Sequence, residues 1–248
     1  MLMSLVVTSF LVNLEFYLHL MGLAMCKEKQ LRDNSCMHCT DDFDFVNRVE
    51  NGTIAAVIMK NTSHFILTFE GSKDFGDWNL NTQIGQSKPT FIKNATTDIK
   101  VHSGWLNGYL KIRQSLWESV DDIKMKLVIV GHSMGGSLAT IAASDFSTIF
   151  DVQLITAESP RVGNKQFVDI VENQVDTIYR ITNMNDIVPL LPGRNFNYVH
   201  TKNEIWINGN KTVYCPEAED LKCIASTWPY NNMNHHAIIL NILVGGCL

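Results

Sequence analysis

The sequence is short of several features that would point to particular classes of protein. Charged residues make up 18% of the 248 residues, the net charge is −5, and no run of Lys or Arg forms a basic stripe. Nucleic-acid binding therefore has no electrostatic support. No apolar run is long enough to span a bilayer, and no repeat or low-complexity linker divides the chain. With 46% hydrophobic residues, we expect one globular domain with a substantial core.

The N-terminal region has the features of a secretory leader, although no Lys or Arg precedes its apolar run. Leu5–Val12 is mostly apolar, and Gly22-Leu23-Ala24 is a small-x-small pattern typical of a cleavage site. A signal anchor is the alternative, but the run is too short to cross a membrane. We therefore predict a cleaved signal peptide over residues 1–24 and a mature domain over residues 25–248.

Two further features agree with export. All six cysteines follow the predicted cleavage site, and four N-x-S/T sequons occur, at Asn51, Asn61, Asn94 and Asn210. Together they predict a disulfide-bonded glycoprotein that is secreted or resides in the lumen of the secretory pathway.

Two of the cysteines form a C-x-x-C pattern, Cys36-Met37-His38-Cys39. A redox site of this pattern needs a βαβ context, which is absent here. A zinc site needs a second pair of ligands nearby, and none is present. A structural disulfide is the interpretation that remains, and we predict no metal site.

Hydrophobic patterning predicts an alternation of strands and helices along most of the chain. Strands alternating with helices imply an α/β fold with a mainly parallel central sheet and helices on both faces. The polar stretch 71–91 is either a surface loop or a mobile flap. The expected strands are 53–59, 64–69, 127–130, 152–156, 177–182, 198–207 and 212–214, and the expected helices are 106–120, 165–173, 236–243 and one that follows Ser133.

The region Lys126 to Ala143 contains a G-x-S-x-G pentapeptide, Gly131-His132-Ser133-Met134-Gly135. Between a strand and a helix, this motif places the serine in a sharp turn with its hydroxyl exposed. The pentapeptide alone would occur by chance in roughly one chain in ten of this length. The apolar strand before it and the alanine-rich helix after it are the context that makes Ser133 a candidate nucleophile.

A serine nucleophile needs a base and an acid that orients the base, in the order Ser, Asp or Glu, His. Asp186 lies just beyond a predicted strand, at the sheet edge where such folds gather their sites. Its alternative role is to cap the turn before Pro189. His235 and His236 are both candidates for the base, and the residues alone do not choose between them. His200 lies within a strand pattern and is interpreted as structural.

Further motifs make the chain resemble the fungal-type class 3 lipases, which have an α/β-hydrolase fold with a lid over the nucleophile and include feruloyl esterases and mono- and diacylglycerol lipases. The similarity runs from about Cys26 to Cys247. The most specific motif is Pro160-Arg161-Val162-Gly163-Asn164. The others are Phe69-Glu70-Gly71-Ser72, Val101-His102-Ser103-Gly104-Trp105, Asn185-Asp186-Ile187-Val188-Pro189 and Glu204-Ile205-Trp206-Ile207.

This resemblance implies a role for each residue of the site. Ser133 is the nucleophile, Asp186 the orienting acid and His236 the base, because the family's His stands a fixed distance before its last cysteine. The backbone N–H groups of Ser72 and Met134 form the oxyanion hole, with the Ser72 hydroxyl as a further donor. Residues Lys73–Leu80 correspond to the lid, whose apolar side chains are Phe75, Trp78 and Leu80.

The resemblance also implies how the cysteines pair, which the sequence leaves open among about fifteen arrangements. The three implied bridges are Cys26–Cys247, Cys36–Cys39 and Cys215–Cys223. A bridge between the two ends of the mature domain closes the longest loop and should stabilise the fold most.

Some positions differ from the family pattern. Glu70 stands where relatives often carry Arg, and Ile238 and Ile239 replace aromatic residues after the catalytic His. Asp74, Gly76 and Asp77 make the lid polar, which leaves open the choice between a lipase and a soluble esterase.

We therefore expect a monomeric, secreted serine hydrolase that cleaves acylglycerol esters at a lipid–water interface without a cofactor. The alternatives are a phospholipase A1, a soluble feruloyl-type esterase or, more remotely, a catalytically silent binding protein.

Overall fold

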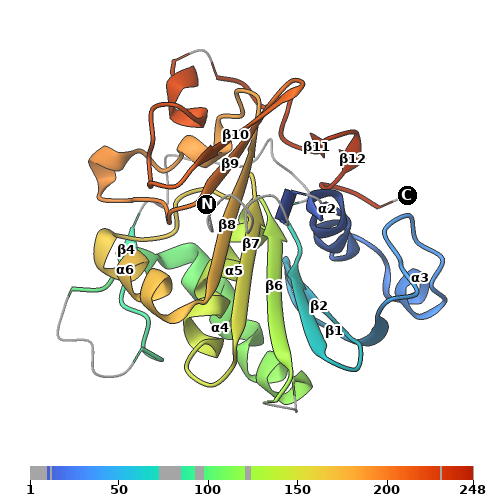
Figure 1. Cartoon of the computed structure of the whole chain (residues 1–248). Helices are drawn as coiled ribbons and strands as arrows, with labels where there is room; N and C mark the ends of the chain where they lie inside the picture. Colours follow the sequence, from blue (N-terminus) through green and yellow to red (C-terminus); the bar gives the residue numbers. More distant parts are fainter. Residues whose placement is uncertain are drawn as a thin grey trace.

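A sheet of eight strands, in the order β1-β2-β3-β6-β7-β8-β9-β10, forms the centre of the molecule (Figure 1). The computed structural model describes residues 10–11, 13–72, 85–92, 98–120, 124–229 and 231–247. The strands of the sheet are β1 (Asp44–Asn51), β2 (Ile54–Lys60), β3 (His64–Phe69), β6 (Lys126–His132), β7 (Val152–Ala157), β8 (Thr177–Asn183), β9 (Glu204–Asn208) and β10 (Lys211–Cys215).

The middle of this sheet is parallel, as the alternation of strands and helices predicts. Neighbouring strands from β3 through β6, β7 and β8 to β9 run in the same direction, whereas β1, β2 and β10 are antiparallel to their neighbours. The central strand β6 is buried on both faces, because Leu127, Val128, Ile129 and Val130 are all apolar. The mainly parallel α/β sheet is therefore confirmed.

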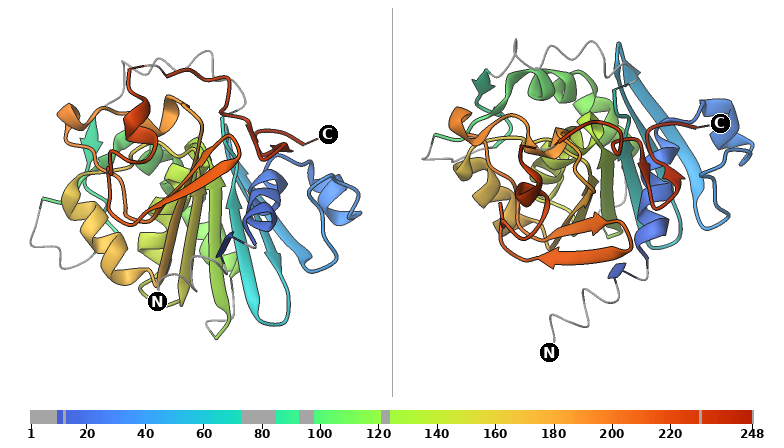
Figure 2. Two further views of the ribbon diagram at one scale, coloured as in Figure 1. Left: turned by 45° about the horizontal axis from the view of Figure 1, so that its top comes forward. Right: turned by 90° about the horizontal axis from the view of Figure 1, so that it is seen from above.

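Helices cover both faces of the sheet (Figure 2). Alternate side chains of β6 point into two separate cores: Leu127 and Ile129 join one, and Val128 and Val130 join the other. The first core includes residues of α4 (Ser103–Ser119), α5 (Met134–Phe146) and α6 (Lys165–Gln174), and the second includes residues of α2 (Leu14–Leu23) and α3 (Glu28–Arg32). Outside the main sheet lie β4 (Gln86–Ser87), β5 (Val101–His102) and the 3₁₀ turns Val188–Leu190, Arg194–Phe196 and Ile224–Thr227.

Helix α2 is formed by residues that the sequence assigns to a leader. It packs against β3 and β6, and its side chains Leu18 and Leu23 are fully buried. Cleavage after Ala24 would remove this helix and expose the apolar face of the sheet beneath it. Cleavage after Ala24 stays a prediction, and it would remove α2 together with the rest of the leader.

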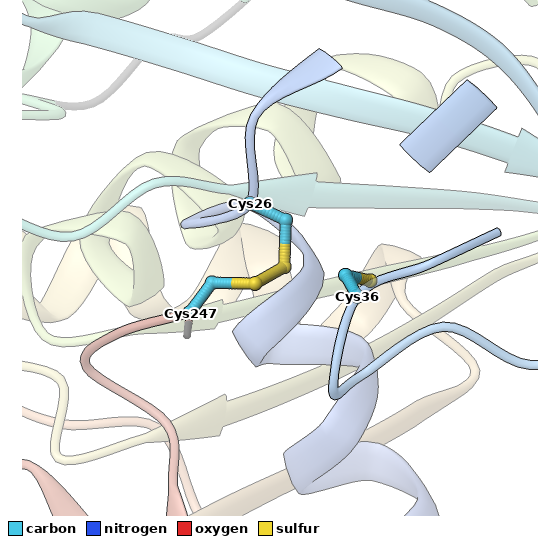
Figure 3. A group of neighbouring side chains, drawn as sticks. All are labelled: Cys26, Cys36 and Cys247. Carbon is cyan, nitrogen blue, oxygen red and sulfur yellow. A yellow bond between two sulfur atoms is a disulfide. The ribbon is translucent and has the colours of Figure 1, made fainter. Parts of the chain in front are cut away.

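Three disulfide bonds are present, Cys26–Cys247, Cys36–Cys39 and Cys215–Cys223, the same pairs that the family resemblance implies. Figure 3 shows the first of them joining the segment after α2 to the C-terminal segment, with Cys36 close by. One sulfur from each of Cys26, Cys36 and Cys247 lies within 4.8 Å of the others. All three are disulfide-bonded, so this cluster offers no thiolate to a metal ion.

The helix predicted over residues 236–243 is wrong. Two short antiparallel strands, β11 (Ile238–Ile239) and β12 (Ile242–Leu243), occupy this region. Leu240 and Asn241 between them have φ angles of 50° and 64°, which belong to a tight hairpin turn and not to a right-handed helix. The β-branched isoleucines on either side of the turn favour this hairpin.

The structure shortens one predicted strand and adds one that was not predicted. The strand predicted over 198–207 begins only at Glu204, because Asn203 has a left-handed φ of 62° and interrupts it. Strand β1 was not predicted, since this edge strand is half exposed and largely polar.

Several predicted features lie outside the described residues. They are the lid over Lys73–Leu80, with Phe75, Trp78 and Leu80, and the sequon at Asn94. Within the described ranges, no helix combines the length and the apolar character that a bilayer crossing requires.

The packing of α2 predicts that Leu18→Ala destabilises the protein. Removing a fully buried leucine side chain costs about 2–5 kcal/mol of unfolding free energy. The control is Glu15→Gln on the exposed side of the same helix, which should cost less than about 1 kcal/mol. Urea denaturation of both purified variants measures the difference. Equal midpoints for Leu18→Ala and the parent protein would show that α2 is not part of the folded domain.

Candidate functional site

Ser133 occupies a sharp turn between β6 and α5. Its backbone angles, φ 57° and ψ −127°, lie outside the regions that side-chain-bearing residues ordinarily adopt. The turn closes only with glycine at the flanking positions: a Cβ on Gly131 would collide with the carbonyl group of Gly135, and a Cβ on Gly135 with that of Phe69. The Ser133 N–H donates to the carbonyl oxygen of Ala157 at 2.9 Å, which fixes the turn to β7.

A buried histidine and a buried carboxylate meet next to this turn. His236 Nδ1 lies 2.5 Å from Asp186 Oδ2, and the two residues are 2% and 0% exposed. Asp186 also accepts the backbone N–H of Val188 through Oδ1 at 3.1 Å. Because the carboxylate accepts at Nδ1, that nitrogen carries the proton, and Nε2 is left as the nitrogen that can accept a proton.

The loop that carries His236 is attached to the end of β8 by backbone and side-chain hydrogen bonds. Asn183 Nδ2 donates to the carbonyl oxygens of His235 and Ile238, at 2.9 and 3.0 Å. The backbone N–H of Asn232 donates to Asn185 O at 3.0 Å. Since Asp186 follows Asn185, the acid and the base are fixed to the same strand end.

His132, one residue before the candidate nucleophile, ties that nucleophile to the same loop. Its Nε2 lies 2.7 Å from the carbonyl oxygen of His236, so Nε2 is the protonated nitrogen and donates. The two imidazole rings are 4.7 Å apart between centroids. Burial, and then the positive charge of a protonated His236, lower the pKa of His132 to about 3. His132 is therefore a neutral donor at ordinary pH.

Ser72 and Met134 lie together beside Ser133. The Ser72 hydroxyl is 3.4 Å from Met134 Sδ. Met134 is the first residue of α5, where a backbone N–H has no partner four residues earlier in the helix. The helix N-terminus also carries a partial positive charge that favours an anion. The site can therefore present N–H donors to a negatively charged oxygen next to the serine.

The remaining candidate histidines lie elsewhere. His235 turns its carbonyl group to Asn183, and the bond to Asp186 is made by its neighbour His236. His200 is buried, with its Nε2 2.6 Å from Pro189 O. Desolvation by burial lowers its pKa well below the ordinary value. His200 therefore supports the turn that follows Asp186 and takes no part in the cluster.

Three residues that shape this site were not recognised from the sequence: His132, Asn183 and Glu158. His132 lies inside the G-x-S-x-G motif, but the motif does not specify its side chain. Asn183 ends a strand, a position where asparagine is common. Glu158 precedes the Pro160–Asn164 motif by two residues, and no spacing rule connects it with Asp186.

Residues 66–196 match the family model described as Lipase (class 3). A secreted mono- and diacylglycerol lipase 1 from Fusarium solani is 30% identical over 82% of this chain and 66% of its own length. A lipase from Rhizomucor miehei is 28% identical over 86% of this chain and 63% of its own length. The chain thus spans just under two thirds of these relatives.

A solved structure of the Rhizomucor miehei lipase with its propeptide superposes with a TM-score of 0.86 at 25% identity. The match covers 97% of this chain and 83% of that one. Residues 25–248 alone could not reach this share, so the match includes part of the N-terminal region.

The buried, neutral His132 predicts a loss of stability in acid. Its pKa in the fold, about 3, lies below the value of about 6.5 expected in the unfolded chain. The unfolded state therefore binds the extra proton, and stability falls as the pH drops from about 6.5 toward 3, by about 1.4 kcal/mol per pH unit for this residue.

His132→Gln, which keeps an N–H donor but does not titrate, should show a shallower pH dependence in urea denaturation between pH 6.5 and 4. His64→Gln, at the first residue of β3, is the matched control. Parallel curves for His132→Gln and the parent protein would contradict the neutral state of His132.

Proposed function

The chain belongs to the class 3 lipase family, and from this premise we propose that it is a secreted serine hydrolase that cleaves the carboxylic esters of acylglycerols. The relatives from Fusarium solani and Rhizomucor miehei carry the names of a mono- and diacylglycerol lipase and a lipase. The observation that carries the proposal is the buried hydrogen bond between His236 and Asp186 next to the Ser133 turn.

In the proposed reaction, the Ser133 hydroxyl attacks the ester carbonyl carbon and passes its proton to His236 Nε2. Asp186 holds the proton on Nδ1 and stabilises the positive charge that the imidazole gains. His236 then gives its proton to the departing alcohol, which leaves an acyl group on Ser133. Water, activated by the same nitrogen, releases the fatty acid and restores the serine.

The negative oxygen that forms during each attack is bound by backbone N–H groups. Met134 N–H at the start of α5 is one donor, and Ser72, whose side chain contacts Met134, supplies the other. Each donor of this kind lowers the activation barrier by about 3–4 kcal/mol. No metal or cofactor takes part.

Exposed apolar side chains near His236 favour a lipid ester over a soluble one. Ile238 is 53% exposed and Leu240 37%, directly after the proposed base, and Trp228 is 65% exposed in the preceding loop. Exposed apolar side chains of this kind suit contact with a lipid–water interface. We propose that the segment Lys73–Leu80 serves as the lid and that the enzyme works as a monomer.

Export of the protein is part of the proposal. The three disulfides suit an oxidising compartment. Asn51 ends β1 and Asn210 lies in the turn between β9 and β10, and both are exposed, so both can carry glycans. The predicted leader over residues 1–24 includes α2, whose apolar side chains pack on the sheet.

The test is Ser133→Ala in the intact chain, assayed on emulsified triglyceride, emulsified monoglyceride, phospholipid micelles and a soluble feruloyl ester. We expect the parent protein to prefer the emulsified acylglycerols, with a rate increase when substrate passes its solubility limit. Ser133→Ala should lose at least about 10³-fold in kcat, because the hydroxyl is the attacking group.

The control Ser35→Ala, in the exposed segment after α3, should keep full activity. Undiminished hydrolysis by Ser133→Ala would overturn the serine mechanism. If phospholipid is the best substrate, the protein is a phospholipase A1 instead. If the soluble ester is the best substrate, it is a feruloyl-type esterase.

A further inference from the structure

Glu158 is a buried acidic residue to which the proposed mechanism gives no role. Glu158 follows β7 and is 0% exposed. Neither of its carboxylate oxygens receives a hydrogen bond of ordinary geometry from the part of the chain that the structure describes. A buried charge without a partner is strongly unfavourable, so the state of this carboxyl group needs an explanation.

Glu158 lies between the nucleophile and the segment that carries the acid. Its backbone N–H donates to Ile181 O of β8 at 2.9 Å, and the carbonyl oxygen of the preceding Ala157 accepts the N–H of Ser133 at 2.9 Å. The backbone of Glu158 has a left-handed φ of 48°, which a glycine would adopt with less strain. The backbone conformation at this position therefore does not explain why the residue is a glutamate.

The carboxyl groups of Glu158 and Asp186 are both 0% exposed, and a hydrogen bond between them requires that one of them carries a proton. Burial first, then the charge of Asp186 and this hydrogen bond, raise the pKa of Glu158 well above its ordinary value. The negative charge of Glu204 on β9 adds to the effect, while a backbone N–H of Asn183 opposes it. Glu204 is itself partly balanced by Arg180, 3.1 Å away.

Two adjacent buried carboxyl groups do not both ionise, so the pair shares one proton. Asp186 accepts from His236 and from Val188, and both contacts require an ionised acceptor or are strengthened by one. We infer that Glu158 is a neutral carboxylic acid that donates a hydrogen bond to the Asp186 carboxylate and thereby positions it toward His236. This inference rests on the proposed serine mechanism, in which Glu158 is a positioning residue and touches no substrate.

The first test detects the proton on Glu158 through the pH dependence of the unfolding equilibrium. The folded protein keeps a proton on Glu158 that the unfolded chain releases above pH about 4.5, so stability is lost as the pH rises. Glu158→Gln cannot titrate but keeps an N–H donor. From pH 5 to pH 8, the unfolding equilibrium constant of the parent protein should rise relative to that of Glu158→Gln by up to tenfold per pH unit. Glu118→Gln, exposed on α4, is the charge-matched control and should follow the parent protein.

The second test measures positioning through kinetics. Glu158→Gly removes the donor and suits the left-handed backbone, so its unfolding midpoint should not fall. Its kcat should nevertheless drop about tenfold or more with little change in KM, because Asp186 is no longer held. Without the donor, the Asp186 charge acts more strongly on His236, so the acid limb of the kcat–pH profile should move to higher pH. Glu158→Gln should restore most of the rate and the position of that limb.

Failure of this inference and failure of the proposed function would give different results. Identical pH dependence of stability in the parent protein and Glu158→Gln would overturn the shared proton. Full activity and an unmoved acid limb in Glu158→Gly would overturn the positioning role. Absence of hydrolysis by the parent protein on every ester would overturn the proposed function, while the unfolding measurements would still decide whether Glu158 carries the proton.

Discussion

The rest of the site depends on the hydrogen bond of 2.5 Å between His236 and Asp186. The two residues are 50 positions apart in the chain, and both are almost completely buried. In such an environment the interaction of opposite partial charges is stronger than in water, but only if the geometry is maintained. Asn183 and the backbone of Asn185 hold the histidine loop to the end of the strand that also leads to Asp186. His132 then links this loop to the serine turn.

The same loop connects the site to the N-terminal part of the fold. The segment after His236 forms the β11–β12 hairpin and ends at Cys247, which is bonded to Cys26 just beyond α2. Helix α2 in turn packs against the strand that ends at the Ser133 turn. Removal of the helix would expose one face of that strand and would also take away the contacts of α2 with β12. The N-terminal residues therefore matter to the site as well as to the core, which is why the position at which any leader ends is a functional question.

Much of the fold could be predicted from the sequence because its signals are local. The apolar residues 127–130 are buried on both faces, which is the pattern of a central parallel strand, and Gly131 and Gly135 are required by the turn itself. The hairpin at 238–243 could not be predicted as easily, because a short apolar segment fits a helix or a strand, and the turn at Leu240 and Asn241 decides between them. The residues of α2 resemble a leader in sequence, because a leader and a buried helix are both short apolar segments. The sequence alone therefore did not predict that this helix packs on the sheet.

Some residues of the candidate site could likewise be predicted from the sequence, and others could not. Ser133, Asp186 and His236 follow from motif order and from the family resemblance. The role of Glu158 does not follow from them. It depends on Asp186, which is distant in sequence, and on burial that no local pattern reveals. Buried polar residues of this kind are recognised only when their surroundings are known.

The most direct measurement of the central claim is a crystal structure of the intact chain after reaction with an alkyl phosphonate ester. The account predicts a covalent bond from Ser133 Oγ to phosphorus and the phosphonyl oxygen within hydrogen-bond distance of the N–H groups of Met134 and Ser72. It also predicts His236 Nε2 next to the position of the leaving group, with the bond to Asp186 unbroken. Phosphorus bound to another residue, or a phosphonyl oxygen turned away from Met134, would contradict it.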